Sequence, residues 1–292
     1  MQKDVKALKY AVIDIGSNTV KMQIYEVIGK SFRKVRYESI PAGLINYIDD
    51  GIMNARGTDV LCSALTKFIS DAGAAGVKNV HSFATASLRR ADNREDILRT
   101  VKEKTGADIH IMSGDEEAEC SFSGIITETG GTHNAVLLDM GGGSTEITAF
   151  DGVKPAGKAS IPFGSLSLYR DFVSHTLPSE SEKDAIKRYV KNEITSCGIS
   201  GKNLFVSGGT GRAVCTLCSH PSELYTAEIS ALYGIAHEYS HKENTLKKIL
   251  PERYKTVLPG LYAMLAAAEL FESNKITFPR AGVREGYLLS II

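Results

Sequence analysis

The pattern of apolar and polar positions divides the chain into strands and amphipathic helices. A continuous apolar run over Lys9–Asp14 is typical of a buried strand, and the alternating stretches Val20–Val27 and Phe32–Ser39 indicate half-exposed strands. Apolar residues at helical spacing predict a helix over Asp59–Ala72, with Thr58 as its N-cap residue. This mixture of elements predicts an α/β protein.

The second half of the chain carries strong helix signals. Ser179 and Glu182 have the spacing of a capping box, which predicts a helix over Glu180–Cys197. Another helix is expected over Ser222–Tyr239, and the apolar residues Leu204–Val206 indicate a short strand.

One segment occurs twice in the sequence. Ala135–Phe150 parallels Ala11–Tyr25: each is a buried strand that ends in Asp-x-Gly, then a turn of small residues, then a second strand. The repeat spacing, from Asp14 to Asp139, is about the length of one domain and indicates duplication. We therefore expect one domain over residues 1–123 and 281–292, and another over 124–280.

Composition narrows the range of partners. The 292 residues contain 34 Lys and Arg against 34 Asp and Glu, so no overall field attracts nucleic acid or an anionic membrane. A polyanionic substrate must therefore be held by a local arrangement of groups. The odd, scattered set of five cysteines forms no disulfide framework. With no signal-peptide pattern at Met1–Leu8 and no long apolar run, a cytoplasmic protein is expected.

Both repeated turns have the chemistry of a phosphate- and cation-binding loop. A tight turn of small residues directs several backbone N–H groups at one anion. An aspartate at the end of the preceding strand can hold a hard cation such as Mg²⁺, directly or through water. One such turn is as readily a plain hairpin, but two copies favour the binding interpretation. The residues are Asp14, Ser17 and Asn18 in the first turn, and Asp139, Gly141, Gly142, Gly143, Ser144 and, on the following strand, Glu146 in the second.

Three other segments are weaker candidates. The acidic stretch Ser113–Glu119 opens a helix as a capping box, but a carboxylate there could also accept a proton from an attacking water. Arg89 follows a buried strand and suits bidentate phosphate binding, with an ordinary surface arginine as the equal alternative. The glycines of Gly208–Gly211 predict a loop that phosphate could approach, with Gly208, Gly209 and Thr210 as its candidates.

Two metal-like patterns have less support. His237-Glu-Tyr-Ser-His241 matches the H-E-x-x-H pattern of zinc proteases, which needs both imidazoles on one helical face and a third ligand such as Glu269 or Glu272. Nothing else in the chain indicates peptide hydrolysis. Cys215, Cys218 and His220 have no partner pair and are expected to pack in a helix.

Taken together, these motifs resemble the exopolyphosphatase / guanosine pentaphosphate phosphohydrolase family, a branch of the actin-like superfamily. The matching segments follow the family order along nearly the whole chain; they are Asp14–Thr19, Ala84–Arg89, Ser113–Ala118, Asp139–Glu146, Gly208–Thr210 and Gly282–Gly286. The resemblance implies two ribonuclease H-like (actin-like) α/β domains with a cleft between them.

The resemblance also implies roles for residues. Glu117 would activate water for in-line attack on a terminal phosphoryl group, and Asp14, Asp139 and Glu146 would organise Mg²⁺. The phosphate-binding set would be Ser17, Asn18, Arg89, Gly141–Ser144 and Gly208–Thr210. The substrate would be inorganic polyphosphate or guanosine pentaphosphate.

The chain departs from the family pattern at several outer positions. Ser167 stands where an arginine is frequent, and Lys255 where an acidic residue is usual. We therefore expect an active hydrolase with an altered substrate preference. The alternatives are an ATP-dependent kinase or ATPase of the same superfamily, and a non-catalytic sensor of polyphosphate or an alarmone. A homodimer is expected only on the general grounds that two-lobed proteins of this size often pair.

Overall fold

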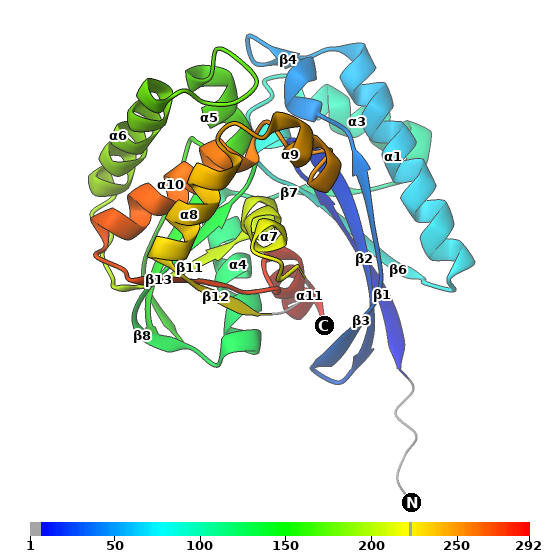
Figure 1. Ribbon diagram of the computed structural model, residues 1–292. Helices are drawn as coiled ribbons and strands as arrows, with labels where there is room; N and C mark the ends of the chain where they lie inside the picture. Colours follow the sequence, from blue (N-terminus) through cyan, green and yellow to red (C-terminus); the bar gives the residue numbers. More distant parts are fainter. Residues whose placement is uncertain (1–6, 222–223) are drawn as a thin grey trace, which may run out of the picture. The chain divides into compact units, whose positions relative to one another are not determined.

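The computed structural model describes residues 7–221 and 224–292, which form two compact units (Figure 1). The first unit holds the residues up to Glu116 together with Arg284–Ile292, and the second is Glu117–Val283. The chain thus enters the second unit within α4 (Gly114–Thr129), before the boundary predicted at 123 and 124. The sequence analysis found no signal-peptide pattern at Met1–Leu8. Most of that segment lies outside the described residues.

A five-stranded sheet forms the centre of the first unit. The strand order is β3-β2-β1-β6-β7, with β1 antiparallel to β2 and parallel to β6. The strands are β1 (Leu8–Ile15), β2 (Thr19–Ile28), β3 (Ser31–Pro41), β6 (Asn79–Ala84) and β7 (Ile109–Ile111). A 3₁₀ turn over Leu44–Tyr47 is followed by a separate two-stranded hairpin, β4 (Ile48–Asp49) and β5 (Ile52–Met53).

Helices pack on the two faces of this sheet. On one face, Ile13 and Met22 join the core of α1 (Ala55–Ala74). On the other, the ring of Phe83 packs against Tyr287 of α11 (Val283–Ile291), with centroids 4.9 Å apart. Two further helices are α2 (Ala86–Arg89) and α3 (Arg94–Thr105).

The N-cap of α1 differs from the predicted one. Asn54 rather than Thr58 caps the helix, because its Oδ1 accepts a hydrogen bond from the backbone N–H of Gly57 at 3.0 Å. Thr58 is buried in the first turn.

The sheet of the second unit repeats the first and extends it by one strand. The order is β10-β9-β8-β11-β13-β12, and the pairing of β8 with β9 and β11 repeats that of β1 with β2 and β6. The predicted duplication is confirmed. The strands are β8 (Thr132–Met140), β9 (Thr145–Gly152), β10 (Lys154–Ile161), β11 (Asn203–Ser207), β12 (Tyr225–Glu228) and β13 (Lys275–Phe278).

An apolar helix, α10 (Val257–Leu270), organises the helical side of the second unit. Residues Val257–Ala268 are all buried, because α10 packs against four other helices (Figure 1). These are α5 (Ser165–Phe172), α6 (Glu180–Ser196), α7 (Gly208–Leu217) and α8 (Ile229–Tyr239), and α8 also contacts α9 (Glu243–Ile249). On the opposite side, Phe122 of α4 packs on Phe150 of β9.

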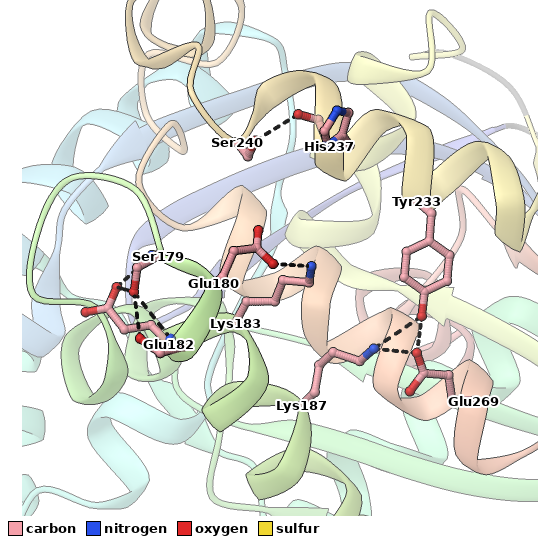
Figure 2. Close-up of polar contacts among 10 residues, drawn as sticks. Ser179, Glu180, Glu182, Lys183, Lys187, Tyr233, His237, Ser240 and Glu269 are labelled. Atoms are coloured by element: carbon pink, nitrogen blue, oxygen red, sulfur yellow. Dashed lines mark hydrogen bonds and ion pairs between the residues drawn. The ribbon is translucent and has the colours of Figure 1, made fainter.

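The capping box of α6 is confirmed. The backbone N–H of Ser179 donates to the Glu182 carboxylate at 2.8 Å, and the Glu182 N–H donates back to the Ser179 hydroxyl (Figure 2). Hydrogen bonds from the backbone of Ser179 and of Ser174 lower the pKa of Glu182 to about 2. Both partners of this local signal lie within one helical turn, so the sequence alone could reveal it.

Two predicted elements were wrong. The helix expected over Ser222–Tyr239 begins only at Ile229, because Tyr225–Glu228 pairs with β13 as a strand. Residues Ser222 and Glu223 lie outside the described part. The loop expected over Gly208–Gly211 is the first turn of α7. Within the described residues, no helix combines the length and the apolar character that crossing a membrane requires.

A glycine in α4 is required by close packing. A Cβ at Gly124 would lie 2.1 Å from the carbonyl oxygen of Gly282, and both of these atoms belong to the second unit. We expect Gly124→Ala to lower the free energy of unfolding by about 1–3 kcal/mol, because backbone atoms cannot move aside as a side chain can. The matched control is Gly73→Ala in α1, where a Cβ has no described neighbour within 4 Å. There the alanine should stabilise by up to about 1 kcal/mol. Urea unfolding of both variants measures the difference, and equal stability of the two would contradict the packing.

Candidate functional site

Four polar side chains lie in one row across the second sheet. Asp139 of β8 pairs with Glu146 of β9, Glu146 pairs with Ser160 of β10, and Asp139 pairs on its other side with Ser207 of β11. Residues directly opposite one another in a sheet project from the same face, with Cβ atoms about 4.5–5.5 Å apart in an antiparallel pair. Asp139, Glu146 and Ser207 are buried. The row therefore places two buried carboxylates side by side.

Helix α4 lies against this row. The hydroxyl of Ser121 donates a hydrogen bond to the Asp139 carboxylate, and Ser160 donates to Glu146 at 2.9 Å. Glu117 is buried one turn before Ser121, on the same face of α4. The structure thus brings Glu117, Asp139 and Glu146 to one face of the second unit.

The two repeated turns are built alike. The N–H of Gly16 donates to the carbonyl of Thr19 at 3.2 Å, and the N–H of Gly141 donates to the carbonyl of Ser144 at 3.0 Å. Asp14 and Asp139 occupy equivalent positions before these turns.

In each turn, carbonyl groups accept hydrogen bonds from the segment after the third strand. The carbonyls of Gly141 and Gly142 accept from the first amides of α5, and those of Ser17 and Asn18 accept from amides of residues 42–45. A trans peptide points its C=O and the next N–H in opposite directions. The N–H groups of Asn18, Gly142 and Gly143 therefore point away from these anchoring segments, as an anion-binding turn requires.

The start of α7 lies against Asp139. Gly208 has φ of +87°, and a Cβ there would lie 2.8 Å from Oδ1 of Asp139, so only glycine allows this approach. At Gly209 a Cβ would meet Nη2 of Arg253 at 2.3 Å. Arg253 thus sits at the N-terminus of α7, a position that the sequence analysis missed. Thr210, by contrast, donates its hydroxyl hydrogen to Ser165 at 2.9 Å and is buried.

The first sheet carries a matching row with a different charge. Asp14 pairs with Lys21, Lys21 pairs with Ser39, and Asp14 pairs on its other side with Phe83. The Lys21 ammonium forms an ion pair with Oδ2 of Asp14 at 3.2 Å. The strand position that holds Glu146 in the second sheet therefore holds a cation in the first.

This difference bears on which carboxylates could hold Mg²⁺. Within residues 7–221 and 224–292, no group of three or more His, Cys, Asp or Glu side chains is placed to hold a metal ion. Mg²⁺ commonly binds through one or two carboxylates together with substrate phosphates and water. The paired oxygen ligands Asp139 and Glu146 fit this mode. Asp14 already faces Lys21, so the metal role of Asp14 stays a prediction.

Arg89 has a backbone partner. Its Nη1 donates to the carbonyl of Met112 at 3.0 Å, at the end of β7. The guanidinium therefore ties α2 to the neighbouring strand, and its binding of phosphate stays a prediction.

The zinc-protease pattern lacks the geometry that it needs. Helix α8 ends at Tyr239, and His241 lies beyond the C-cap residue Ser240, so the two imidazoles are not on one helix. The proposed third ligand, Glu269, contacts Tyr233 and Lys187 (Figure 2). Burial raises its pKa, but hydrogen bonds from Lys187, Lys191 and Tyr233 lower the pKa of Glu269 to about 2.

The positions that depart from the family pattern have structural partners here. The Ser167 hydroxyl accepts from the N–H of Gly164 at 2.8 Å at the start of α5. The Lys255 ammonium lies 5.8 Å from the centroid of the Tyr169 ring. Ser167 therefore supplies no cation at the start of α5, and Lys255 supplies one beside Tyr169.

Comparison with known proteins gives a consistent assignment. The model of the Ppx/GppA phosphatase family matches residues 43–292. A putative exopolyphosphatase of Haemophilus influenzae is 24% identical, over 96% of this chain and 90% of that protein. A guanosine-5'-triphosphate,3'-diphosphate pyrophosphatase of Aliivibrio fischeri is 26% identical over 97% of this chain, which spans 59% of that longer protein. The crystal structure of an exopolyphosphatase from Cytophaga hutchinsonii superposes with a TM-score of 0.89 at 19% identity, over 97% of both chains.

The chain belongs to the Ppx/GppA phosphatase family. The expected fold, two actin-like α/β domains, is confirmed. The expected enzyme class is confirmed as far as the family shows it, since the matching family is one of phosphatases. The cleft between the domains and the roles of the individual site residues stay predictions.

The contact between α4 and the row can be tested by stability. Ser121→Ala removes the hydroxyl that donates to the buried Asp139 carboxylate, so the free energy of unfolding should fall by about 1–3 kcal/mol. Ser123→Ala, at an exposed position of the same helix, should change it by less than about 0.5 kcal/mol. Chemical denaturation compares the two, and an unaffected Ser121→Ala variant would show that the hydroxyl does not support Asp139.

Proposed function

We propose that this protein hydrolyses the terminal phosphoanhydride bond of inorganic polyphosphate or of guanosine pentaphosphate, with Mg²⁺ as cofactor. The observation that carries the proposal is the buried pair Asp139 and Glu146, with Glu117 one helical turn from the contact between α4 and Asp139. A protein keeps two like charges side by side mainly where a cation or a substrate uses them.

Glu117 is proposed as the general base. Its carboxylate would accept a proton from the attacking water as the water oxygen bonds to the terminal phosphorus and the bridging P–O bond breaks. The products are orthophosphate and a chain shortened by one phosphate. Transition states of this kind are stabilised by positioned charges rather than by a covalent nucleophile, which suits a site built of carboxylates and N–H groups.

Asp139 and Glu146 would hold Mg²⁺, which when bound would offset the negative charge of the phosphate chain. Asp14, which already faces Lys21, would contribute indirectly, through water. The N–H groups of both glycine turns would bind phosphate oxygens, with Arg253 as an added donor at the start of α7.

The choice between the two substrates rests on similarity. The relatives are named for polyphosphate and for guanosine-5'-triphosphate,3'-diphosphate, which is a guanosine pentaphosphate, and both substrates offer a terminal phosphoanhydride bond. The serine at position 167, where an arginine is frequent in the family, supports an altered substrate preference such as one for shorter polyphosphates. Cytoplasmic location and a homodimer remain expectations from the sequence.

Glu117 can be tested against a neighbour on the same helix. Glu117→Gln should lower phosphate release from tripolyphosphate by about 100- to 10,000-fold, because the amide cannot accept the proton. Binding of tripolyphosphate, measured by calorimetry, should persist. The control Glu119→Gln changes an exposed residue paired with Lys158 and should leave turnover within about twofold. Normal turnover in the Glu117 variant would remove this residue from the mechanism.

The cofactor and substrate class can be tested together. Phosphate release is measured from tripolyphosphate, long polyphosphate, guanosine pentaphosphate and ATP, with Mg²⁺ and with EDTA. We expect phosphate release from at least one of the first three substrates, and this release should require Mg²⁺. The Glu146→Gln variant should raise the Mg²⁺ concentration that gives the half-maximal rate by about tenfold, since one of two carboxylate ligands is lost. Hydrolysis of ATP alone would favour the kinase or ATPase alternative. Tight binding without any hydrolysis would favour the sensor.

A further inference from the structure

The segment between α8 and α10 carries a local excess of positive charge. Over residues 242–255 it has five cations against two carboxylates, although the whole chain has 34 basic and 34 acidic residues. The cations are Lys242, Lys247, Lys248, Arg253 and Lys255. A cluster of one sign on a neutral protein creates a local field that favours an anionic ligand.

Two tyrosine rings hold Lys255 at the surface. Its Nζ lies 5.8 Å from the centroid of the Tyr169 ring and 5.7 Å from that of the Tyr254 ring. The Nζ of Lys247 lies 5.1 Å from the same Tyr254 centroid, so two ammonium groups share this ring. The Tyr169 ring is itself fixed, because its hydroxyl donates to the carbonyl of His175 at 3.0 Å. Attraction to a ring face positions an ammonium group without using its N–H donors.

The N–H donors of Lys255 are available to a ligand. Lys255 is exposed, and among the residues that the structure describes its ammonium forms no ion pair. Lys247, by contrast, is paired with Glu243. An ammonium group has three donors, so an anion that reaches Lys255 finds hydrogen bonds without displacing a paired carboxylate.

Tyr169 links Lys255 to the second glycine turn. Tyr169 lies on α5, and the N–H of Ser165 at the start of this helix donates to the carbonyl of Gly141 at 3.0 Å. Ser165 precedes Tyr169 by four residues, which is a rise of about 6 Å along the helix. The ring that holds Lys255 is therefore about one helical turn from the glycine turn.

Arg253 provides a second link between Lys255 and the candidate site. It precedes Lys255 by two residues, and its guanidinium lies at the start of α7, where a Cβ at Gly209 would meet Nη2 at 2.3 Å. The neighbouring Gly208 lies against Oδ1 of Asp139. Cationic groups therefore lead from the buried Asp139, through Arg253, to Lys255 at the surface.

We propose that Lys255, supported by Lys247, is an outer subsite for a phosphate group that is remote from the cleaved bond. In polyphosphate this group is a unit beyond those held at the glycine turn and Arg253. In guanosine pentaphosphate it is the 3'-diphosphate. The inference rests on the proposed function and makes Lys255 a residue that determines substrate specificity.

The test compares charge reversal at two lysines with substrates that differ only in the remote group. Lys255→Glu should raise KM for a longer polyphosphate by about tenfold, because attraction becomes repulsion, and Lys255→Gln by about two- to fivefold. KM for tripolyphosphate, and kcat for both substrates, should stay within about twofold. The second substrate pair is guanosine pentaphosphate and GTP, which lacks the 3'-diphosphate.

The matched control is Lys248→Glu. Lys248 is exposed on the same short helix as Lys247, and within the described residues it contacts neither an aromatic ring nor a carboxylate. Its reversal should change every KM by less than about twofold at about 0.1 M salt, where charges outside the subsite are screened. Thermal melting reports whether each variant is folded.

The outcomes separate the subsite from a general effect of charge. A rise in KM confined to the substrate with the remote phosphate, and to the Lys255 variants, supports the proposal, and the affected pair identifies the ligand. An equal rise for both members of a pair, an equal effect of Lys248→Glu, or no effect in a folded Lys255→Glu variant overturns it. Wild-type cleavage of tripolyphosphate or GTP without cleavage of either larger substrate also overturns it. A wild-type protein that cleaves no phosphate substrate would instead reject the proposed function, and this inference with it.

Discussion

Two carboxylates held next to one another in a sheet are the feature around which the second unit is arranged. Asp139 and Glu146 face each other across β8 and β9, and both are buried. Desolvation and mutual repulsion each disfavour such a pair, so surrounding groups must support it. Ser121 and Ser160 each donate a hydrogen bond to one member, and the N-terminus of α7 directs the positive end of its dipole toward Asp139.

The duplicated sheets show how one backbone can serve two electrostatic purposes. The order and pairing of five strands, and the hydrogen bond that closes each turn, are the same in both units. Both units have an aspartate before the turn, but the residue opposite that aspartate differs. It is Lys21 in the first unit and Glu146 in the second. The pair of side chains beside the first turn is therefore one cation with one carboxylate, whereas the pair beside the second turn is two carboxylates.

Close packing fixes the geometry of these turns. Gly164 lies against the carbonyl groups of Gly141 and Gly142, and a Cβ at Gly164 would lie 2.5 Å from the carbonyl carbon of Gly142. The first amides of α5 can therefore reach the turn carbonyls, and the N–H groups of the turn are directed the other way. Glycine in this protein thus serves approach between backbones, at the turn and at the start of α7, more than flexibility.

Local signals in the sequence were sufficient for a large part of this structure. The repeated strand and turn, the strand-end acids Asp14 and Asp139, and the capping box at Ser179 depend on residues within a few positions of one another, so their pattern is visible without coordinates. The family resemblance also depended on short motifs. It led to Glu117 and Glu146, which the structure places on the same face of the second unit as Asp139.

What only the tertiary structure decided involves residues distant in the chain. The register of β8 with β11 puts Ser207 beside Asp139, the docking of α4 puts Ser121 on the same carboxylate, and α11 returns Glu285 to Tyr25 of the first sheet. The position of Arg253 at the start of α7 was likewise not predicted. The hydroxyl of Thr210, a predicted phosphate-binding residue, donates its hydrogen bond to Ser165. Helix docking and strand register depend on the shape and burial of whole surfaces, which short stretches of sequence do not encode. The sequence therefore determined which groups the protein carries, and packing determined which of them meet.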